Sequence, residues 1–210
     1  ADPGQDGEVV ERGISYVVRS SEQIKRTDNQ HPTSDRDIRY SIRETQKMTI
    51  AEQLSAFRKG ELKSSDSFYF GETPAVYGED YSGYPLVMNQ KDFKKSHTLK
   101  HNVPNRVFKK LAELLSTPIM AFKEADRSAV VLNDVDADGK PLVATLHAGE
   151  SMDRRKVTAV TSLYGIDNWN AWINNQSKKE ISIYDKKRAN SYLQTYGSSA
   201  SVEEAIRSMG

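Results

Sequence analysis

Basic residues and two histidines gather in one stretch of this 210-residue chain. Between Lys91 and Lys110, seven lysine or arginine residues stand against one acidic residue, Asp92, and the same stretch holds His97 and His101. Seven positive charges against one negative charge give the stretch a charge of +6. A local charge of this size is typical of a surface that binds phosphate groups, and a solvated helix face is the alternative.

The spacing of His97 and His101 limits what a histidine can do in this stretch. Four residues can place two imidazoles on one face of a helix. A metal site needs a third ligand, however, and the stretch has no His-Glu-x-x-His motif, so we expect no metal. A single histidine acting as a general acid or base fits better, because the pKa of an imidazole lies near working pH.

Further polar side chains fall at the ends of predicted strands. His147 closes one such strand, and alternation places Ser162 and Tyr164 on one face of the next. Lys123 and Arg127 flank a predicted hairpin upstream. These positions are candidates for a site at the edge of a sheet, although an ordinary surface role for His147 is equally common.

The composition of the whole chain sets limits on this chemistry. The 30 basic and 29 acidic residues give a net charge of +1, so nucleic-acid binding must depend on where the charge lies. The absence of cysteine excludes a disulfide scaffold, a thiolate zinc site and a cysteine nucleophile. No apolar run approaches the roughly 18 residues of a membrane span. The sequence also lacks a glycine-rich phosphate loop, a nucleophile elbow and a dinucleotide fingerprint, which argues against kinases, α/β-hydrolases and Rossmann enzymes.

A partial calcium motif occurs in the middle of the chain. Asp134, Asp136 and Asp138 match the first half of an EF-hand loop, but Thr145 stands where the loop needs its bidentate glutamate. Asp138 is followed by Gly139, and this dipeptide favours a two-residue turn between strands. We therefore expect a hairpin here.

The elements that must position these side chains follow from apolar periodicity. Residues 1–48 are polar and are expected to form an extended or partly ordered arm with one short strand at 14–18. A capping box opens a helix at Thr49, and a second helical region, 91–116, breaks before Pro104. Short β-branched runs are expected to form strands at 67–70, 84–88, 118–123, 129–135, 142–147, 157–163 and 181–184. Asp167 and Asp185 are expected to cap two C-terminal helices, and Ser201 to Glu204 is a second capping box. We predict an α+β domain over 49–210, in which N-terminal helices pack on a four- to five-stranded antiparallel sheet, with C-terminal helices.

The order of several short motifs resembles the C-terminal domain found on phage MuF-type head morphogenesis proteins. The resemblance covers about residues 49–195, and residues 37–41 are similar to a linker phrase of polyvalent phage proteins. The motifs that carry it are Phe70-Gly71-Glu72-Thr73-Pro74, Tyr84 to Gln90, Lys100-His101, Thr117 to Lys123, Ala129 to Leu132, Lys140 to His147, Ser162 to Gly165 and Tyr184 to Lys187.

This resemblance implies kinship with toxin-like nucleases of the barnase, colicin and RelE type. Such proteins pack N-terminal helices on an antiparallel sheet and cleave RNA without a metal. One position departs from the pattern, because Glu124 stands where a small polar residue usually follows the hairpin lysine. The polar positions that match are His101, Lys123, His147, Ser162 and Tyr164.

RNA cleavage without a metal needs a base for the 2′-hydroxyl proton, an acid for the 5′ leaving oxygen and cations around the phosphate. His101 and His147 would supply base and acid in either order, and Tyr164 would donate a hydrogen bond or stack on a base. Lys123 would help to stabilise the phosphate. The other phosphate-binding residues would be Lys94, Lys95, Lys100, Arg106 and Arg127.

The sequence therefore predicts a ribonuclease-like toxin domain of a phage or prophage structural protein, independent of metal and cofactor, with RNA as substrate. An immunity protein is one expected partner. The site of action would be the bacterial cytoplasm, the phage particle or a target cell. The alternative is a non-catalytic module that binds a capsid component or host protein through the arm and the basic stretch. A third hypothesis, an NAD-consuming toxin, predicts nicotinamide release, but the sequence offers no recognisable nucleotide cradle.

Overall fold

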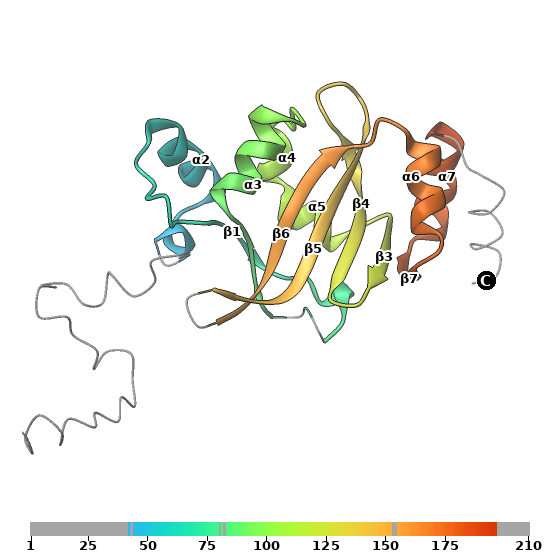
Figure 1. Ribbon diagram of the computed structural model, residues 1–210, viewed down its shortest axis with the longest axis horizontal. Helices are drawn as coiled ribbons and strands as arrows, with labels where there is room; N and C mark the ends of the chain where they lie inside the picture. Colours follow the sequence, from blue (N-terminus) through green and yellow to red (C-terminus); the bar gives the residue numbers. More distant parts are fainter. Residues whose placement is uncertain (1–41, 43, 80, 82, 153–154, 197–210) are drawn as a thin grey trace, which may run out of the picture. The chain divides into compact units, whose positions relative to one another are not determined.

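One mixed sheet forms the centre of the chain in the computed structural model (Figure 1). The structure describes residues 42, 44–79, 81, 83–152 and 155–196. The strand order is β1-β2-β6-β5-β4-β3-β7, and β3 to β6 form a consecutive antiparallel meander. The strands are β1 (Phe68–Glu72), β2 (Pro85–Met88), β3 (Met120–Glu124), β4 (Arg127–Val135), β5 (Pro141–Met152), β6 (Arg155–Gly165) and β7 (Glu180–Tyr184).

The α+β class is confirmed, but the predicted size of the sheet is wrong. Seven strands are present among the described residues, rather than four or five, and β2 runs parallel to β6. The strand β7 pairs antiparallel with β3 at the opposite edge. These pairings join segments far apart in the sequence, and apolar alternation within a single segment carries no information about its partner.

Helices cover both faces of the sheet (Figure 1). One face packs against an aromatic and aliphatic cluster from the N-terminal half, which includes Phe68, Phe93 and Phe108. The other face packs against the C-terminal helices through Trp169 and Leu193. The helices are α2 (Ile50–Lys59), α3 (Gln90–Lys94), the π-helix η4 (Lys95–Leu99), α4 (Asn105–Lys109), α5 (Leu111–Ser116), α6 (Trp169–Gln176) and α7 (Lys186–Tyr196), with short 3-10 turns η2 (Thr45–Lys47) and η3 (Ala75–Tyr77).

Alternation along the central strands explains why both faces are apolar. On β5, Leu142, Ala144 and Leu146 belong to the cluster with the N-terminal helices. Val143 lies between them in sequence and belongs to the cluster with α6 and α7. Side chains two residues apart share a face of a strand, so one sequence run supplies two cores.

Local capping signals place several helix ends correctly. Thr49 and Glu52 form the predicted capping box, and Gly60 ends α2 with φ of +72°. The carboxylate of Asp185 accepts a hydrogen bond from the backbone amide of Arg188 in the first turn of α7. The predicted cap of α6 is off by one residue, because the side chain of Asn168, not that of Asp167, accepts from Ala171 N. The capping box predicted at Ser201 to Glu204 and the strand predicted at residues 14–18 lie outside the described residues.

The packed part of the chain includes residues upstream of Thr49, within the segment predicted to be an arm. Ile42 is buried with Val87 and Val157, and Thr45 is buried with its hydroxyl donating to the carbonyl of Ser67 at 2.7 Å. Among the described residues, no helix is both long and apolar enough to cross a bilayer.

Candidate functional site

The end of β6 brings a histidine and a tyrosine together. His101 lies between η4 and α4, and its ring centroid is 5.3 Å from that of Tyr164, with 39° between the ring planes. Both side chains are half-buried. The backbone turns here because Asn102 adopts φ of +46° and Pro104 precedes α4, which ends one helical run and starts another.

Charged neighbours set the protonation of His101. Burial lowers the pKa of His101 below its usual value, and the ammonium groups of Lys100 and Lys95 lower it further. The carboxylate of Asp167 acts in the opposite direction and is the weaker influence. The imidazole is therefore neutral at neutral pH and can accept a proton.

Asp167 is itself held by a lysine from the neighbouring hairpin. Lys140 Nζ lies 2.7 Å from Asp167 Oδ1 and 3.3 Å from Asp138 Oδ2. The hydrogen bond from Lys140 lowers the pKa of Asp167, and the two carboxylates raise the pKa of Lys140. The carboxylate of Asp167 therefore stays ionised near His101.

The hairpin that carries Lys140 is fixed by a buried carboxylate. Asp136 is 5% exposed, and its Oδ1 accepts hydrogen bonds from the backbone amides of Asp138 and Lys140, each at 2.9 Å. A Cβ added to Gly165 would lie 1.9 Å from Asp136 Oδ2, so glycine is needed at the end of β6. The hairpin predicted from Asp138 and Gly139 is confirmed, but its turn is longer than two residues, because the amide of Asp136 donates to the carbonyl of Lys140 and Val135 pairs with Pro141.

The predicted phosphate-binding residues of the basic stretch are used in different ways. Lys95 and Lys100 are exposed and make no ion pair with the described residues; we call these two residues the basic surface. Lys94 lies over the ring of Phe57, 5.5 Å from its centroid. Arg106 forms an ion pair with Asp134 and donates to the carbonyl of Val135 at 2.9 Å, so it ties α4 to the end of β4.

His97, the other histidine of the stretch, has a structural role. Its Nδ1 is 2.7 Å from the carbonyl of Val103, and its ring packs against those of Phe93 and Phe108. The two histidines therefore do not converge on one ligand. Within the described part of the chain, no three or more acidic, histidine or cysteine side chains are arranged to hold a metal ion.

His147 lies in a different environment. Its Nε2 is 2.5 Å from Asp126 Oδ2, and its Nδ1 is 2.5 Å from Glu150 Oε1. A carboxylate can only accept, so both contacts are hydrogen bonds only when both ring nitrogens carry protons. The hydrogen bond to His147 lowers the pKa of Asp126.

The structure does not bring His147 to His101. Tyr164, the neighbour of His101, pairs with Val143, whereas His147 pairs with Arg127 and Ala159. The four residue steps from Val143 to His147 correspond to roughly 13 Å along the strand. The expectation that His147 closes its strand is wrong, because β5 continues to Met152 and its other end meets Tyr164.

The remaining predicted residues lie on three different strands of the sheet. Ser162 Oγ donates to Thr145 Oγ1 at 2.9 Å, between the two ends of β6. Arg127 is exposed and lies opposite His147. Lys123 faces the side of the sheet covered by the N-terminal helices, because its neighbour Phe122 packs against α6 and α7.

Sequence reasoning missed Asp167, whose carboxylate acts on the pKa of His101, and Lys140, which pairs with Asp167. Each stands next to a turn, where charged side chains are common, so neither residue type nor spacing separates them from ordinary surface residues. The one available signal is the antiparallel meander itself. In such a meander the turn after Asp136 and the last residue of β6, Gly165, lie at the same end of the strands.

Comparison with known proteins gives one match. Residues 92–191, which run from α3 into α7, match the family model described as the phage MuF C-terminal domain. This confirms the resemblance drawn from the sequence motifs. No curated protein and no solved structure matches the chain.

Proposed function

We propose that the phage MuF-type C-terminal domain of this chain is a metal-independent ribonuclease and that His101 is its catalytic base. The observation that carries the proposal is a half-buried imidazole, kept neutral by burial and two lysines, next to Tyr164 and the basic surface. A base and a source of positive charge are the first two requirements for attack of a 2′-hydroxyl on a phosphate.

The proposed reaction uses the 2′-hydroxyl of the RNA as nucleophile. His101 takes the 2′-hydroxyl proton, the 2′-oxygen forms a bond to phosphorus, and the bond from phosphorus to the 5′-oxygen breaks. The 5′-oxygen takes a proton from the Tyr164 hydroxyl, which lies on the ring in contact with His101, and solvent restores the proton of Tyr164. The products are a 2′,3′-cyclic phosphate and a 5′-hydroxyl. Lys95 and Lys100 would attract the phosphate and stabilise its developing charge.

Cleavage of an RNA oligonucleotide by the full chain in excess chelator tests this proposal. We expect a 2′,3′-cyclic phosphate product, and we expect His101→Ala to lower the rate by about 10²–10⁴-fold, the usual contribution of an acid–base group. The melting temperature of this variant should stay close to that of the wild type, because His101 makes no hydrogen bond or ion pair with the described residues. Equal rates for the two proteins would contradict the role of His101.

A second candidate function is a binding module without catalysis, whose partner is a capsid component or a host protein. One observation favours it: His147 lies roughly 13 Å along β5 from Val143, which is paired with the neighbour of His101, Tyr164, so the two histidines do not form the expected acid–base pair. This function predicts that RNA stays intact at every pH in the same assay, while the basic surface still binds an acidic partner.

A further inference from the structure

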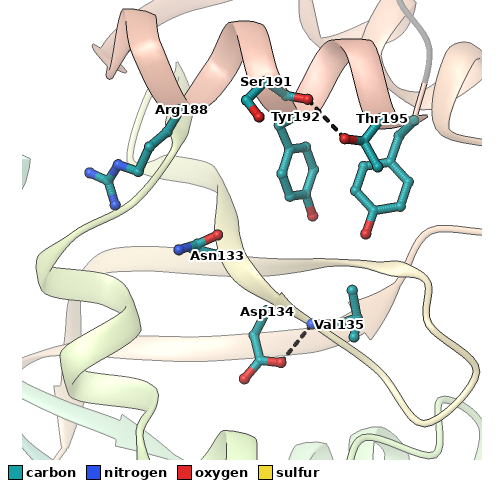
Figure 2. A pocket seen from close by; sticks show the side chains of 8 residues that line it. Asn133, Asp134, Val135, Arg188, Ser191, Tyr192 and Thr195 are labelled. Carbon is teal, nitrogen blue, oxygen red and sulfur yellow. Dashed lines mark hydrogen bonds between the residues drawn. The ribbon is translucent and has the colours of Figure 1, made fainter.

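A cavity of about 290 Å³ opens between α7 and the end of β4, outside the site of His101. Figure 2 shows the ring of Tyr192 reaching from α7 toward β4, with Asn133 on the strand opposite it. This volume lies at the lower end of the range for small-molecule sites, so it suits one flat ring rather than a larger ligand. The residues that line the cavity are Asn133, Asp134, Val135, Arg188, Ser191, Tyr192, Thr195 and Tyr196.

The charged residues at this cavity are already engaged. Arg188 donates to the carboxylate of Asp185 and to the carbonyls of Thr117 and Pro118. Asp134 forms its ion pair with Arg106 of α4, and in Figure 2 its carboxylate lies on the other side of β4 from the Tyr192 ring. The cavity therefore offers neutral groups, which favours a neutral ligand over an ion.

Two kinds of neutral group remain available to a ligand. The side-chain amide of Asn133 is exposed and makes no hydrogen bond with the described residues, so one donor and one acceptor lie side by side. Tyr192 and Tyr196 supply ring surface, with centroids 4.6 Å apart, and Trp169 packs behind them at 5.5 Å and 6.3 Å.

The hydroxyl of Tyr192 cannot be reached from the cavity. Its oxygen is out of contact with solvent, and burial raises the pKa of Tyr192, so the hydroxyl stays protonated at neutral pH. A ligand in the cavity therefore meets the ring of Tyr192 and not its hydroxyl.

We propose that this cavity binds an unpaired adenine, stacked on the tyrosines of α7 and held on its edge by Asn133. An asparagine amide pairs with adenine in a bidentate way, because adenine presents the N6 amino donor beside the N7 acceptor. On this N7 edge guanine presents two acceptors, N7 and O6, and uracil presents only its O4 acceptor. Stacking on tyrosine with edge hydrogen bonds is the usual way in which single-stranded RNA bases are recognised.

The position of the cavity relative to His101 explains which molecule would supply the adenine. Val135 pairs with Pro141, and Leu142 pairs with Gly165, so the last residues of β4 and of β6 lie at the same end of the sheet. Two strand spacings separate them, or roughly 10 Å. An RNA strand could thus place one nucleotide in the cavity and a nearby phosphate at His101. This choice of RNA as the source of adenine rests on the proposed function.

Titration of the full chain with AMP, CMP, GMP and UMP by calorimetry tests the cavity. We expect AMP to bind most tightly, CMP next through its amino group, and GMP and UMP most weakly. Asn133→Ala should weaken AMP binding about tenfold or more, the usual discrimination of a bidentate pair. Asn175→Ala is the matched control, because Asn175 is an exposed asparagine on α6 outside the cavity, and it should bind AMP as the wild type does.

A second variant tests the edge recognition itself. Asn133→Asp replaces the donor with a second acceptor, so it should lose affinity for AMP and gain affinity for GMP, whose N1 and N2 groups donate. Absence of AMP binding, or equal AMP affinity in wild type and Asn133→Ala, would overturn the proposal. Loss of AMP binding in Asn175→Ala would overturn it too.

Two further experiments test the cavity independently of the catalytic proposal. They also distinguish RNA from a free nucleotide as the source of the adenine. His101→Ala should bind AMP as the wild type does, whether or not the wild type cleaves RNA. A 2′-O-methyl hexa-adenylate resists cleavage and should bind at least tenfold more tightly than AMP at low salt, because its phosphates reach the basic surface. Equal affinity for AMP and the oligonucleotide would overturn RNA as the source and leave a free nucleotide.

Discussion

Toward its start and toward its far end, β5 lies beside histidine environments of opposite charge. At the start of the strand, His101 lies beside Tyr164 and two lysines that disfavour its protonated form. Further along, His147 contacts the carboxylates of Asp126 and Glu150. The same residue type thus has cationic neighbours toward one end of the strand and anionic neighbours toward the other. The chemistry of a histidine here depends on its neighbours more than on its position on a strand.

The largest expected difference between the two ends is in RNA cleavage. His147→Ala should keep the rate within about tenfold of the wild type, whereas His101→Ala should lose about 10²–10⁴-fold. The double variant should be no slower than His101→Ala alone. Rates for the two single variants are to be measured with one RNA substrate in chelator, and an equal loss in both would show that the two histidines act together despite their separation.

The second difference is in how much stability each region loses when a glycine near it is replaced by alanine. Gly165→Ala should lower the free energy of unfolding by about 1–3 kcal/mol, because the added Cβ displaces the Asp136 carboxylate that fixes the hairpin. Gly149→Ala, near His147, should cost roughly 1 kcal/mol, since its φ is +72° but no atom lies within 4 Å of the new Cβ. Urea denaturation measures both. A larger loss in Gly149→Ala would mean that the edge at Gly165 is the more adaptable one.

The third difference is in how the stability of the fold depends on pH in the acidic range. The hydrogen bond from His147 lowers the pKa of Asp126 below its ordinary value of 3.8. A carboxylate whose pKa is lowered by folding stabilises the fold above its unfolded pKa, and this contribution is lost as the pH falls through the folded pKa. Asp126→Asn should therefore melt below the wild type at pH 6 and converge with it below pH 3.8. Calorimetry at a series of pH values checks this, and a constant difference across the series would contradict it.

The smallest expected effect is in the salt dependence of RNA binding. Lys100→Ala should reduce the slope of log affinity against log salt concentration by about 1, as expected for one lost phosphate contact. Lys178→Ala, an exposed lysine after α6, is the control and should leave the slope unchanged. The measurement uses a 2′-O-methyl oligonucleotide. An unchanged slope for Lys100→Ala would remove Lys100 from the phosphate-binding surface.

The fold could be predicted from the sequence wherever a signal is local. Thr49 and Glu52 predict the start of a helix, Pro104 predicts a break between helices, and Asp138 with Gly139 predicts a turn. Each depends on groups within a few residues of one another. The size of the sheet could not be predicted in this way, because β2 and β7 find their partners across long stretches of chain.

The candidate site was predicted in part, and for the same reason. The stretch from Lys91 to Lys110 marks the position of His101, and Tyr164 falls beside it. His147 illustrates what residue pattern alone leaves open. The sequence predicts that His147 and His101 supply acid and base in either order, but β5 runs on past His147 to Met152, and its start is the end that meets Tyr164.

The pH dependence of RNA cleavage in chelator tests the central claim most directly. A neutral His101 acting as base predicts that the rate falls on the acid side through a pKa below 6.5, because burial and the neighbouring lysines lower the pKa of His101. Lys95→Ala and Lys100→Ala should each move this limb to higher pH, since each removes a positive charge, while His147→Ala should leave it in place. A fall in rate at low pH that disappeared in His147→Ala and persisted in His101→Ala would contradict the role of His101 as the base.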